Sequence, residues 1–390
     1  MKSKRDRAGV NFNPFHIFLN TILLRDFVEE EKLHCLSVTM ESNSTVSPVN
    51  TTTTPNTTIS PLSAANFDIS SSSLTRSVAW VTTILLPVAI LLGVFGNVMT
   101  IIIVRRFRAE SRSSTMDPYM LILAVADLCV VITGTLPVWA ADTMGFQVFR
   151  THDVVCKTGL FVLNLGAASS AWILVAMTTQ RALSVAWPHR VNVLCTPRRS
   201  WWIILTIVVA LCLAYSHLLY GFGILPSAGR ACAMVSKGYA SFMYKIWVNV
   251  DIFLFSLLPF VCLFFSNSVL VLKLRTSVKD AGDQFATTDT QQASRKRKAN
   301  SVTLTAIVVS VVFVVLTSPL AFYNMLTYMN TNPEAVDVRN LAGRFFPMRL
   351  FHIMVFFNYS VNFYLYCLTG EKFRKEFRKI MCGWRHHADI

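Results

Sequence analysis

Residues 119–141 read YMLILAVADLCVVITGTLPVWAA, an apolar run that holds a single acidic side chain, Asp127. A run of about 20 apolar residues is long enough to cross the hydrocarbon core of a bilayer as a helix. A carboxyl group at that depth is costly unless it is paired, solvated or protonated. This stretch therefore predicts a transmembrane helix, and Asp127 is a candidate functional residue.

Apolar runs of similar length occur along most of the chain. Lipid cannot hydrogen-bond free backbone groups, and these runs lack the alternation of barrel strands, so each is expected to be an α-helix. We therefore predict an all-α membrane protein, a seven-transmembrane helix bundle over residues 79–369. Its expected spans are residues 79–104, 119–141, 155–180, 201–225, 242–272, 302–329 and 345–369.

The overall composition supports this class and argues against others. Of the 390 residues, 53% are hydrophobic and only 15% are charged, which is too few charges for an ordinary soluble surface. The net charge is +15, but the basic residues lie between apolar runs, so we expect no nucleic-acid partner. The chain has no P-loop, dinucleotide-binding turn, zinc-peptidase motif or nucleophile elbow, so we expect neither enzymatic activity nor an enzyme cofactor.

Lysine and arginine collect at alternate connections between the runs. The first, third and fifth connections and the C-terminal tail are basic, whereas the even connections and residues 41–78 are much poorer in these residues. The positive-inside rule then places the N-terminus outside the cell and the C-terminus in the cytoplasm. We expect a multi-pass protein of the plasma membrane.

The N-terminal region divides into two parts. Residues 40–78 are rich in Ser, Thr, Asn and Pro, which predicts a disordered extracellular tail with glycosylation sequons at Asn43, Asn50 and Asn56. Residues 1–39 begin with basic residues and continue with a semi-apolar run, as in a signal peptide. The alternative is that Met40 is the working start, and both interpretations stay open.

Residues 370–390 are predicted to form a cytoplasmic amphipathic helix and tail. In residues 371–381, Phe373, Phe377, Ile380 and Met381 share one face, and lysines and arginines surround the other. This pattern is typical of a short helix that lies on an anionic membrane surface. Cys382 follows directly and is a candidate for palmitoylation.

Taken together, these features resemble the rhodopsin-like (class A) G protein-coupled receptors over roughly residues 76–382. Gly96-Asn97 matches the Gly-Asn pair of the first helix, and the sequence LAVADL at residues 123–128 is close to the second helix motif Leu-Ala-x-x-Asp-Leu. Pro259 matches the proline of the fifth helix. The resemblance implies a receptor that changes shape when it binds an extracellular ligand.

A central polar cluster is part of this resemblance. Asp127 and Ser170 each lie roughly 14–16 Å from the cytoplasmic ends of their helices, and Asn358 and Asn362 share one face of the seventh helix. Together with Asn97, they resemble the family cluster that holds a sodium ion in the inactive state. The implied ligands of a sodium ion are Asp127 and Ser170; a hydrogen-bonded knot without metal is the alternative.

The resemblance also implies a disulfide and excludes two ligand classes. Cys156 matches the family's outer cysteine, and its implied partner is Cys232, in the second extracellular connection. The position of the amine-binding aspartate is Leu163, and the position of the retinal-binding lysine is Phe356. We therefore expect neither an amine nor a retinal Schiff base at these positions.

The G-protein-coupling motif is present in altered form. Arg181 and Pro188 match the family positions, but Gln180 replaces the acid before the arginine and Ala182 replaces the tyrosine after it. In the family, that acid restrains the arginine at rest. The hypothesis that follows is raised signalling without ligand.

Other switch positions are also mixed. Phe313, Pro319 and Tyr366 match family residues, whereas Thr317 replaces the usual tryptophan and Phe363 replaces the proline of Asn-Pro-x-x-Tyr. A proline gives a helix a place to pivot. The end of the seventh helix is similar to that of many invertebrate neuropeptide receptors.

Polar side chains of both charges lie in the outer half of the predicted bundle. Asp251 is the leading candidate acceptor for a cation or an amide; its alternatives are a position at the headgroup level or a pairing with Lys245. For His352 we favour a structural hydrogen bond, and for Arg349 a solvated rim charge is the alternative. The candidate ligand-binding residues are Asp142, Asn164, Asp251, Tyr323, Asn324, Arg349 and His352.

The leading interpretation is a receptor that transmits the binding of an extracellular ligand, most simply a short neuropeptide, to a heterotrimeric G protein. Two alternatives remain. One is a chemosensory or decoy receptor of the same fold with weak coupling, and the other is a seven-span transporter, for which we find no internal repeat or broken helices.

Overall fold

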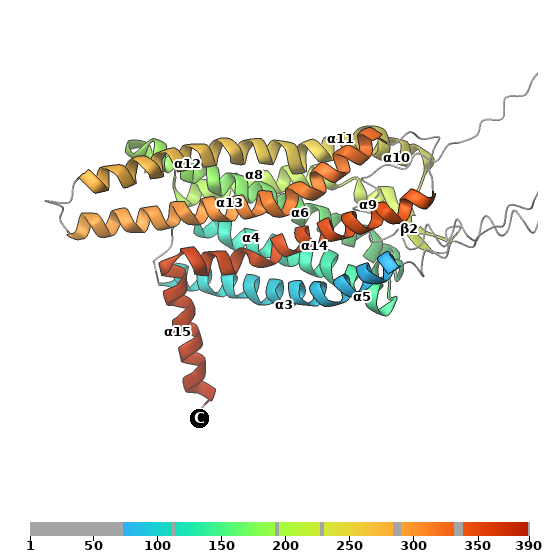
Figure 1. Ribbon diagram of the computed structural model, residues 1–390, viewed down its shortest axis with the longest axis horizontal. Helices are drawn as coiled ribbons and strands as arrows, with labels where there is room; N and C mark the ends of the chain where they lie inside the picture. Colours follow the sequence, from blue (N-terminus) through green and yellow to red (C-terminus); the bar gives the residue numbers. More distant parts are fainter. Residues whose placement is uncertain are drawn as a thin grey trace, which may run out of the picture.

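Long helices lie side by side and form an elongated bundle (Figure 1). The structure is a computed structural model. The expected leader and the sequons at Asn43, Asn50 and Asn56 lie outside the residues that it describes. The described residues are 73–110, 114–191, 195–226, 230–283, 290–330 and 338–388.

The predicted spans correspond to helical segments that are generally longer than predicted. The first two are α3 (Ser73–Ala109) and the unit of α4 (Asp117–Val130), η2 (Val131–Thr135) and α5 (Leu136–Met144). The third and fourth are α6 (Asp153–Ala186) and α8 (Pro197–Tyr215), which α9 (Leu218–Gly221) follows. The fifth is a unit of α10 (Lys237–Phe242), η6 (Met243–Trp247), α11 (Val248–Asp251), η7 (Ile252–Leu257) and α12 (Leu258–Asp283). The last two are α13 (Thr290–Asn330) and α14 (Val338–Thr369), and α15 (Glu371–Ala388) follows them.

Six helical segments of the described chain are long and apolar enough to cross a membrane. The seventh predicted span lies within α14, which packs against α3 and α13. Several large apolar side chains point away from the bundle: Leu91, Leu213 and Phe264 are 71%, 71% and 68% exposed. A soluble protein rarely exposes so much apolar surface, and lipid is the environment that such a surface fits.

Two spans contain a wide helical turn just before a proline. The η2 turn ends two residues before Pro137, and the η7 turn ends two residues before Pro259. A proline ring clashes with the carbonyl four residues earlier and cannot donate a hydrogen bond. A widened turn relieves that clash, so each helix passes the proline without ending.

The described residues form the expected helical bundle and, in addition, one small β-hairpin. The predicted span 201–225 is helical only as far as Gly221, and β1 (Phe222–Leu225) then pairs antiparallel with β2 (Ala231–Met234). The hairpin lies at the end of the bundle opposite α15 (Figure 1). We call these two ends of the bundle the hairpin end and the α15 end.

Two contacts attach the hairpin to the start of α6. Cys156 and Cys232 form the implied disulfide, with a Cα–Cα distance of 5.7 Å. Close by, the backbone N–H of Ile224, which lies opposite Cys232 in the hairpin, donates to Asp153 Oδ1 at 3.0 Å. The disulfide and the hydrogen bond thereby fix the hairpin to the first turn of α6.

At the other end, α15 turns away from the axis of the bundle (Figure 1). Phe373 and Ile380 are buried, as the amphipathic pattern predicts, but Met381 is 41% exposed. The expected apolar face therefore ends at Ile380. The helix itself continues to Ala388, beyond the predicted end at 381.

Candidate functional site

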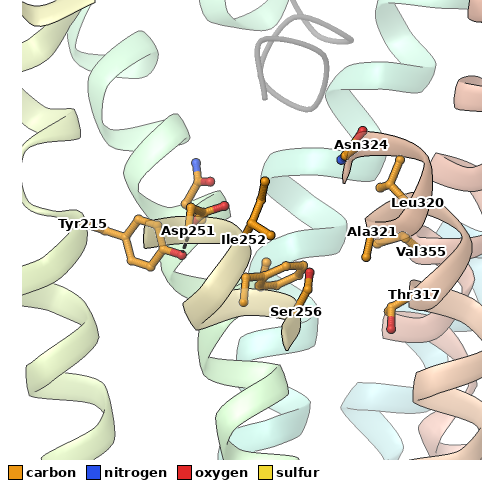
Figure 2. A pocket seen from close by; sticks show the side chains of 12 residues that line it. Tyr215, Asp251, Ile252, Ser256, Thr317, Leu320, Ala321, Asn324 and Val355 are labelled. Carbon is orange, nitrogen blue, oxygen red and sulfur yellow. Dashed lines mark hydrogen bonds between the residues drawn. The ribbon is translucent and has the colours of Figure 1, made fainter. Parts of the chain in front are cut away.

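A cavity opens inside the bundle toward its hairpin end (Figure 2). It lies among α6, the segment from α11 to η7, α13 and α14, with Tyr215 of α8 at one side. Figure 2 shows Asp251 and Tyr215 on one wall and Thr317, Leu320 and Asn324 on the facing one. The lining residues are Asn164, Ala167, Tyr215, Asp251, Ile252, Phe255, Ser256, Thr317, Leu320, Ala321, Asn324 and Val355.

Asp251 is the one acidic residue of this lining. Its side chain is buried, and Oδ1 accepts a hydrogen bond from Tyr215 Oη at 2.6 Å. Asp251 therefore faces the interior of the bundle, and its described side-chain partner is Tyr215, not Lys245. The tyrosine orients the carboxylate and leaves Oδ2 with its acceptor capacity toward the cavity.

Three other polar residues of the lining have hydrogen-bonding groups that the structure describes. Asn164 Nδ2 donates to the Leu160 carbonyl at 2.7 Å, and Thr317 Oγ1 donates to the Phe313 carbonyl at 2.7 Å. Asn324 Oδ1 is buried and has no hydrogen-bond partner within the described chain. The Thr317 hydroxyl and one of the two Asn164 N–H groups thus donate inside the protein, while Asp251 and Asn324 present acceptor oxygens to the cavity.

The four remaining ligand candidates lie outside the cavity lining. Asp142 of α5 forms an ion pair with Arg349 of α14. The side chain of Arg349 is only 14% exposed, so the alternative that Arg349 is a solvated charge at the rim is wrong. His352 Nδ1 lies 2.8 Å from the Met348 carbonyl of its own helix, which agrees with a structural hydrogen bond. Tyr323 stacks edge-on at 5.7 Å from Phe351.

Deeper in the bundle, Asp127 forms a second polar centre. It is 0% exposed, and its two oxygens accept hydrogen bonds from Ser170 Oγ and Asn362 Nδ2, both at 2.7 Å. The contact between Asp127 and Ser170 agrees with their matched depths. Three helices, α4, α6 and α14, therefore meet at one carboxyl group.

Two members of the expected polar cluster take other places. Asn97 Nδ2 donates to the backbone carbonyl of Tyr359 at 2.9 Å, so it ties α3 to α14 without reaching the carboxylate. Asn358 is buried, but the hydrogen bonds to Asp127 come from Ser170 and Asn362. The cluster is thus smaller than the sequence predicted.

The donor set at Asp127 suits a small monovalent cation. Each carboxylate oxygen accepts one hydrogen bond and keeps further lone pairs, and the Ser170 hydroxyl donates its proton and keeps its acceptor capacity. Hard oxygen ligands of this kind match an alkali cation. Asp127 and Ser170 are the residues that would hold it.

Gln180, at the α15 end, contacts α8 and the connection before it. Ser200 Oγ donates to Gln180 Oε1 at 3.2 Å, and Cys195 Sγ donates to the Gln180 carbonyl at 3.7 Å. Burial raises the pKa of the Cys195 thiol, which therefore stays protonated as a donor. Within the residues that the structure describes, Arg181 Nε has no hydrogen-bond partner. The side chain of Gln180 thus contacts Ser200 of α8.

The helices around Arg181 are joined by neutral groups. Ser310 Oγ of α13 donates to Asn267 Oδ1 of α12 at 2.9 Å, and Ser301 Oγ donates to the Thr369 carbonyl of α14 at 2.7 Å. The basic run Arg295–Lys298 lies on α13 just before Ser301. Breaking a hydroxyl hydrogen bond of this kind costs less free energy than breaking a buried ion pair.

The other predicted functional residues have clear positions. Phe313 is buried, with its ring 6.1 Å from that of Phe260, and Pro319 lies inside the continuous helix α13. Tyr366 is buried, and its hydroxyl has no partner among the described residues. Pro188 is exposed in η4 (Pro188–Arg190), and Cys382 is exposed on α15.

Sequence reasoning missed two residues of these sites, Tyr215 and Ser200. Tyr215 ends the apolar helix α8 and has no motif around it; a lone tyrosine in a membrane helix usually sits at the interface. Ser200 lies in a polar helix start, where a capping role is the ordinary expectation. Only the packing of α8 reveals that Tyr215 faces Asp251 and Ser200 faces Gln180.

Comparison of the sequence with known proteins shows that the chain is similar to membrane receptors. Residues 96–367 match the family described as 7 transmembrane receptor (rhodopsin family). The chain is 28% identical over 324 residues to the thyrotropin-releasing hormone receptor of Bos taurus, covering 77% of this chain and 78% of that one. It is 26% identical over 306 residues to galanin receptor type 2 of Rattus norvegicus, covering 75% and 73%. It is 23% identical over 297 residues to type-1 angiotensin II receptor B of Xenopus laevis, covering 74% and 76%.

Proposed function

The chain belongs to the rhodopsin family of seven-transmembrane receptors, and on this premise we propose that it transmits the binding of an extracellular neuropeptide to a heterotrimeric G protein. The observation that carries the proposal is the cavity at the hairpin end, because it offers an oriented carboxylate and stands above a buried polar centre. The similar receptors named for thyrotropin-releasing hormone, galanin and angiotensin II support a peptide ligand.

The deep group of the ligand is a hydrogen-bond donor. Asp251 and Asn324 present acceptor oxygens, while the Thr317 hydroxyl and one N–H of Asn164 donate inside the protein. A primary amide, an ammonium or a guanidinium group would satisfy these oxygens. A carboxylate in the same place would leave two anions close together in a partly desolvated cavity.

Signalling follows from differential affinity for two arrangements of the bundle. A ligand shifts the population only as far as it binds one arrangement better than the other. The neutral contacts of α13 with α12 and α14 give way at modest cost, and α13 then moves and exposes Arg181 to the G protein beside Pro188, which is already exposed.

The orientation follows from the same proposal. The hairpin end faces the outside, and the basic α15 end faces the cytoplasm at the plasma membrane. The amphipathic α15 then lies against anionic lipid, with Cys382 exposed for palmitoylation. A sodium ion at Asp127 and Ser170 stabilises the resting arrangement; the receptor requires no enzyme cofactor and binds no nucleic acid.

Screening amidated neuropeptides on cells that express residues 40–390 tests the proposal, with G protein activation as the readout. For a peptide that activates the receptor, Asp251→Asn is expected to reduce potency by about tenfold or more, because a charge-assisted hydrogen bond is lost. Asn249→Asp, an exchange of the same size two residues away, lies outside the cavity lining and serves as the control.

Three results would contradict the proposal. A peptide that binds the receptor without any nucleotide exchange on the G protein would point to a decoy. Equal potency on Asp251→Asn and on the unmodified receptor would remove Asp251 from the ligand site. Current or substrate uptake in cells that lack G proteins would favour a transporter.

A further inference from the structure

Aromatic rings from three elements meet around Phe363 of α14. The side chain of Phe363 is 2% exposed. Its ring centroid lies 5.8 Å from that of Phe95 on α3, 5.8 Å from that of Phe373 and 5.3 Å from that of Phe377, both on α15. Edge-to-face pairs at these distances add to the packing energy of the rings. One side chain of α14 therefore joins α3 to α15.

The sequence of α3 is adapted to this ring. A Cβ atom on Gly96 would lie 2.9 Å from Phe363 Cβ and 3.4 Å from the ring of Tyr364. Any larger residue at position 96 would push Phe363 away from α3. The close approach of the two helices at this level thus depends on Gly96.

The neighbour of Phe363 in sequence contacts the buried carboxylate. Asn362 Nδ2 donates to Asp127 Oδ2 at 2.7 Å. Successive residues of an α-helix point about 100° apart. Asn362 therefore faces Asp127, while Phe363, the next residue, faces α3 and α15. A shift of Asn362 therefore displaces Phe363 as well.

The backbone of α14 transmits this shift without a hinge. Pro347 is the proline inside α14, and the helix continues through Phe363 to Thr369. The family proline would remove the bond from residue 363 to the Tyr359 carbonyl, which here also accepts Asn97 Nδ2 at 2.9 Å. With phenylalanine the bond is kept, and the inner part of α14 moves as a rod.

We propose that Phe363 is the positioning residue that transmits the state of the Asp127–Asn362 contact to α15. Glu376 of α15 is buried and lies 3.7 Å from Arg106 of α3, so α15 has a second attachment to the helix that Phe363 touches. The importance of this coupling for signalling rests on the proposed function. The coupling itself is a property of the bundle and is measured without ligand or G protein.

The experiment uses the full chain in phosphatidylcholine–phosphatidylglycerol nanodiscs, with an environment-sensitive fluorophore on Cys382. This cysteine is exposed, whereas the other free cysteines of the described chain are buried or partly buried. Asp127→Asn perturbs the contact with Asn362. We expect it to change the quenching of the label by a water-soluble quencher about twofold in the otherwise unmodified chain, and to have no effect in the presence of Phe363→Ala.

Phe356→Ala is the matched control, because Phe356 is equally buried on the same helix but packs with Leu86, Val138 and Ile353. The twofold response should persist in this variant. Phe377→Leu, which alters the ring cluster from the α15 side, should reduce the response and serves if Phe363→Ala does not fold. A full response in folded Phe363→Ala or in Phe377→Leu would overturn the proposal, as would its loss in Phe356→Ala.

Discussion

The hairpin half and the α15 half of the bundle use polar groups in opposite ways. In the hairpin half, the cavity beside Asp251 exposes acceptor oxygens, and the wide turns η2, η6 and η7 interrupt the helices. In the α15 half, α13 and α14 are regular, and hydroxyl contacts and aromatic rings fill the space between the helices. The hairpin half thus keeps hydrogen-bond acceptors available in a cavity, whereas the α15 half uses its polar and aromatic groups for contacts between helices.

Asp127 lies between these two halves and takes part in both. It joins α4, α6 and α14 through hydrogen bonds that are satisfied within the protein. A complete buried hydrogen-bond network stabilises the fold, and removing one member lowers stability because it leaves the remaining polar groups without partners. Under the proposed function, we expect a ligand that shifts α14 or α6 to act on the α15 half through this centre.

The largest effect is expected from breaking the hairpin half at its disulfide. Cys232→Ser removes the bond that ties β2 to α6, and we expect a loss of about 2–5 kcal/mol in the free energy of unfolding. Thermal unfolding and the amount of receptor at the cell surface are the measurements. Cys212→Ser, a change at a partly buried free cysteine, is the control. A Cys232→Ser variant as stable as this control would contradict the prediction.

A second, smaller effect is expected at the centre between the halves. Asp127→Ala leaves the donors of Ser170 and Asn362 without their acceptor and should lower the free energy of unfolding by about 2 kcal/mol. The measurement is unfolding of the purified receptor in sodium chloride and in choline chloride.

The two salts separate the metal from the hydrogen bonds. If a sodium ion is bound at Asp127, sodium should stabilise the unmodified receptor and leave Asp127→Ala unchanged. Equal stability of the unmodified receptor in both salts would exclude the ion. If Asp127→Ala were as stable as the unmodified receptor in choline chloride, the hydrogen bonds would contribute little.

A third change tests the hypothesis that Arg181 of the α15 half is weakly restrained, because Gln180 replaces the family acid. Gln180→Glu places an acid beside the arginine, and a new pair worth about 1 kcal/mol should reduce ligand-free signalling by about fivefold. The measurement is second messenger in the absence of ligand, normalised to surface receptor. Gln180→Asn controls for the loss of the Ser200 contact. Signalling of the unmodified receptor at the level of mock-transfected cells would refute the hypothesis.

The smallest effect is expected at the rim of the α15 half. Arg106 is 51% exposed, so its ion pair with Glu376 is weakened by solvent. Arg106→Gln should therefore cost no more than about 1 kcal/mol, and the cost should fall in high salt. Unfolding in low and high salt is the measurement. A loss much larger than that of Lys375→Gln, an exposed pair within α15, would show that Arg106 has a larger role.

Much of the fold could be predicted from apolar runs alone, because length and hydropathy are local properties. The predictions failed where a tertiary contact decided the local structure. Residues 222–225 continue an apolar run, but they pair with Ala231–Met234, and the Ile224 N–H donates a hydrogen bond to Asp153 Oδ1. Asn97 has the right motif, yet the position of α14 directs its amide to the Tyr359 carbonyl.

By itself, the sequence determined the membrane helices, their order and the acid at Asp127, because burying apolar side chains in lipid needs no partner elsewhere in the chain. Only the tertiary structure decided which polar groups meet: Tyr215 with Asp251, Gln180 with Ser200, and Phe363 with α15. A hydrogen bond or a ring contact acts over a few ångströms, so its partners are set by how the helices rotate and approach. That geometry comes from packing between distant segments, which no local pattern records.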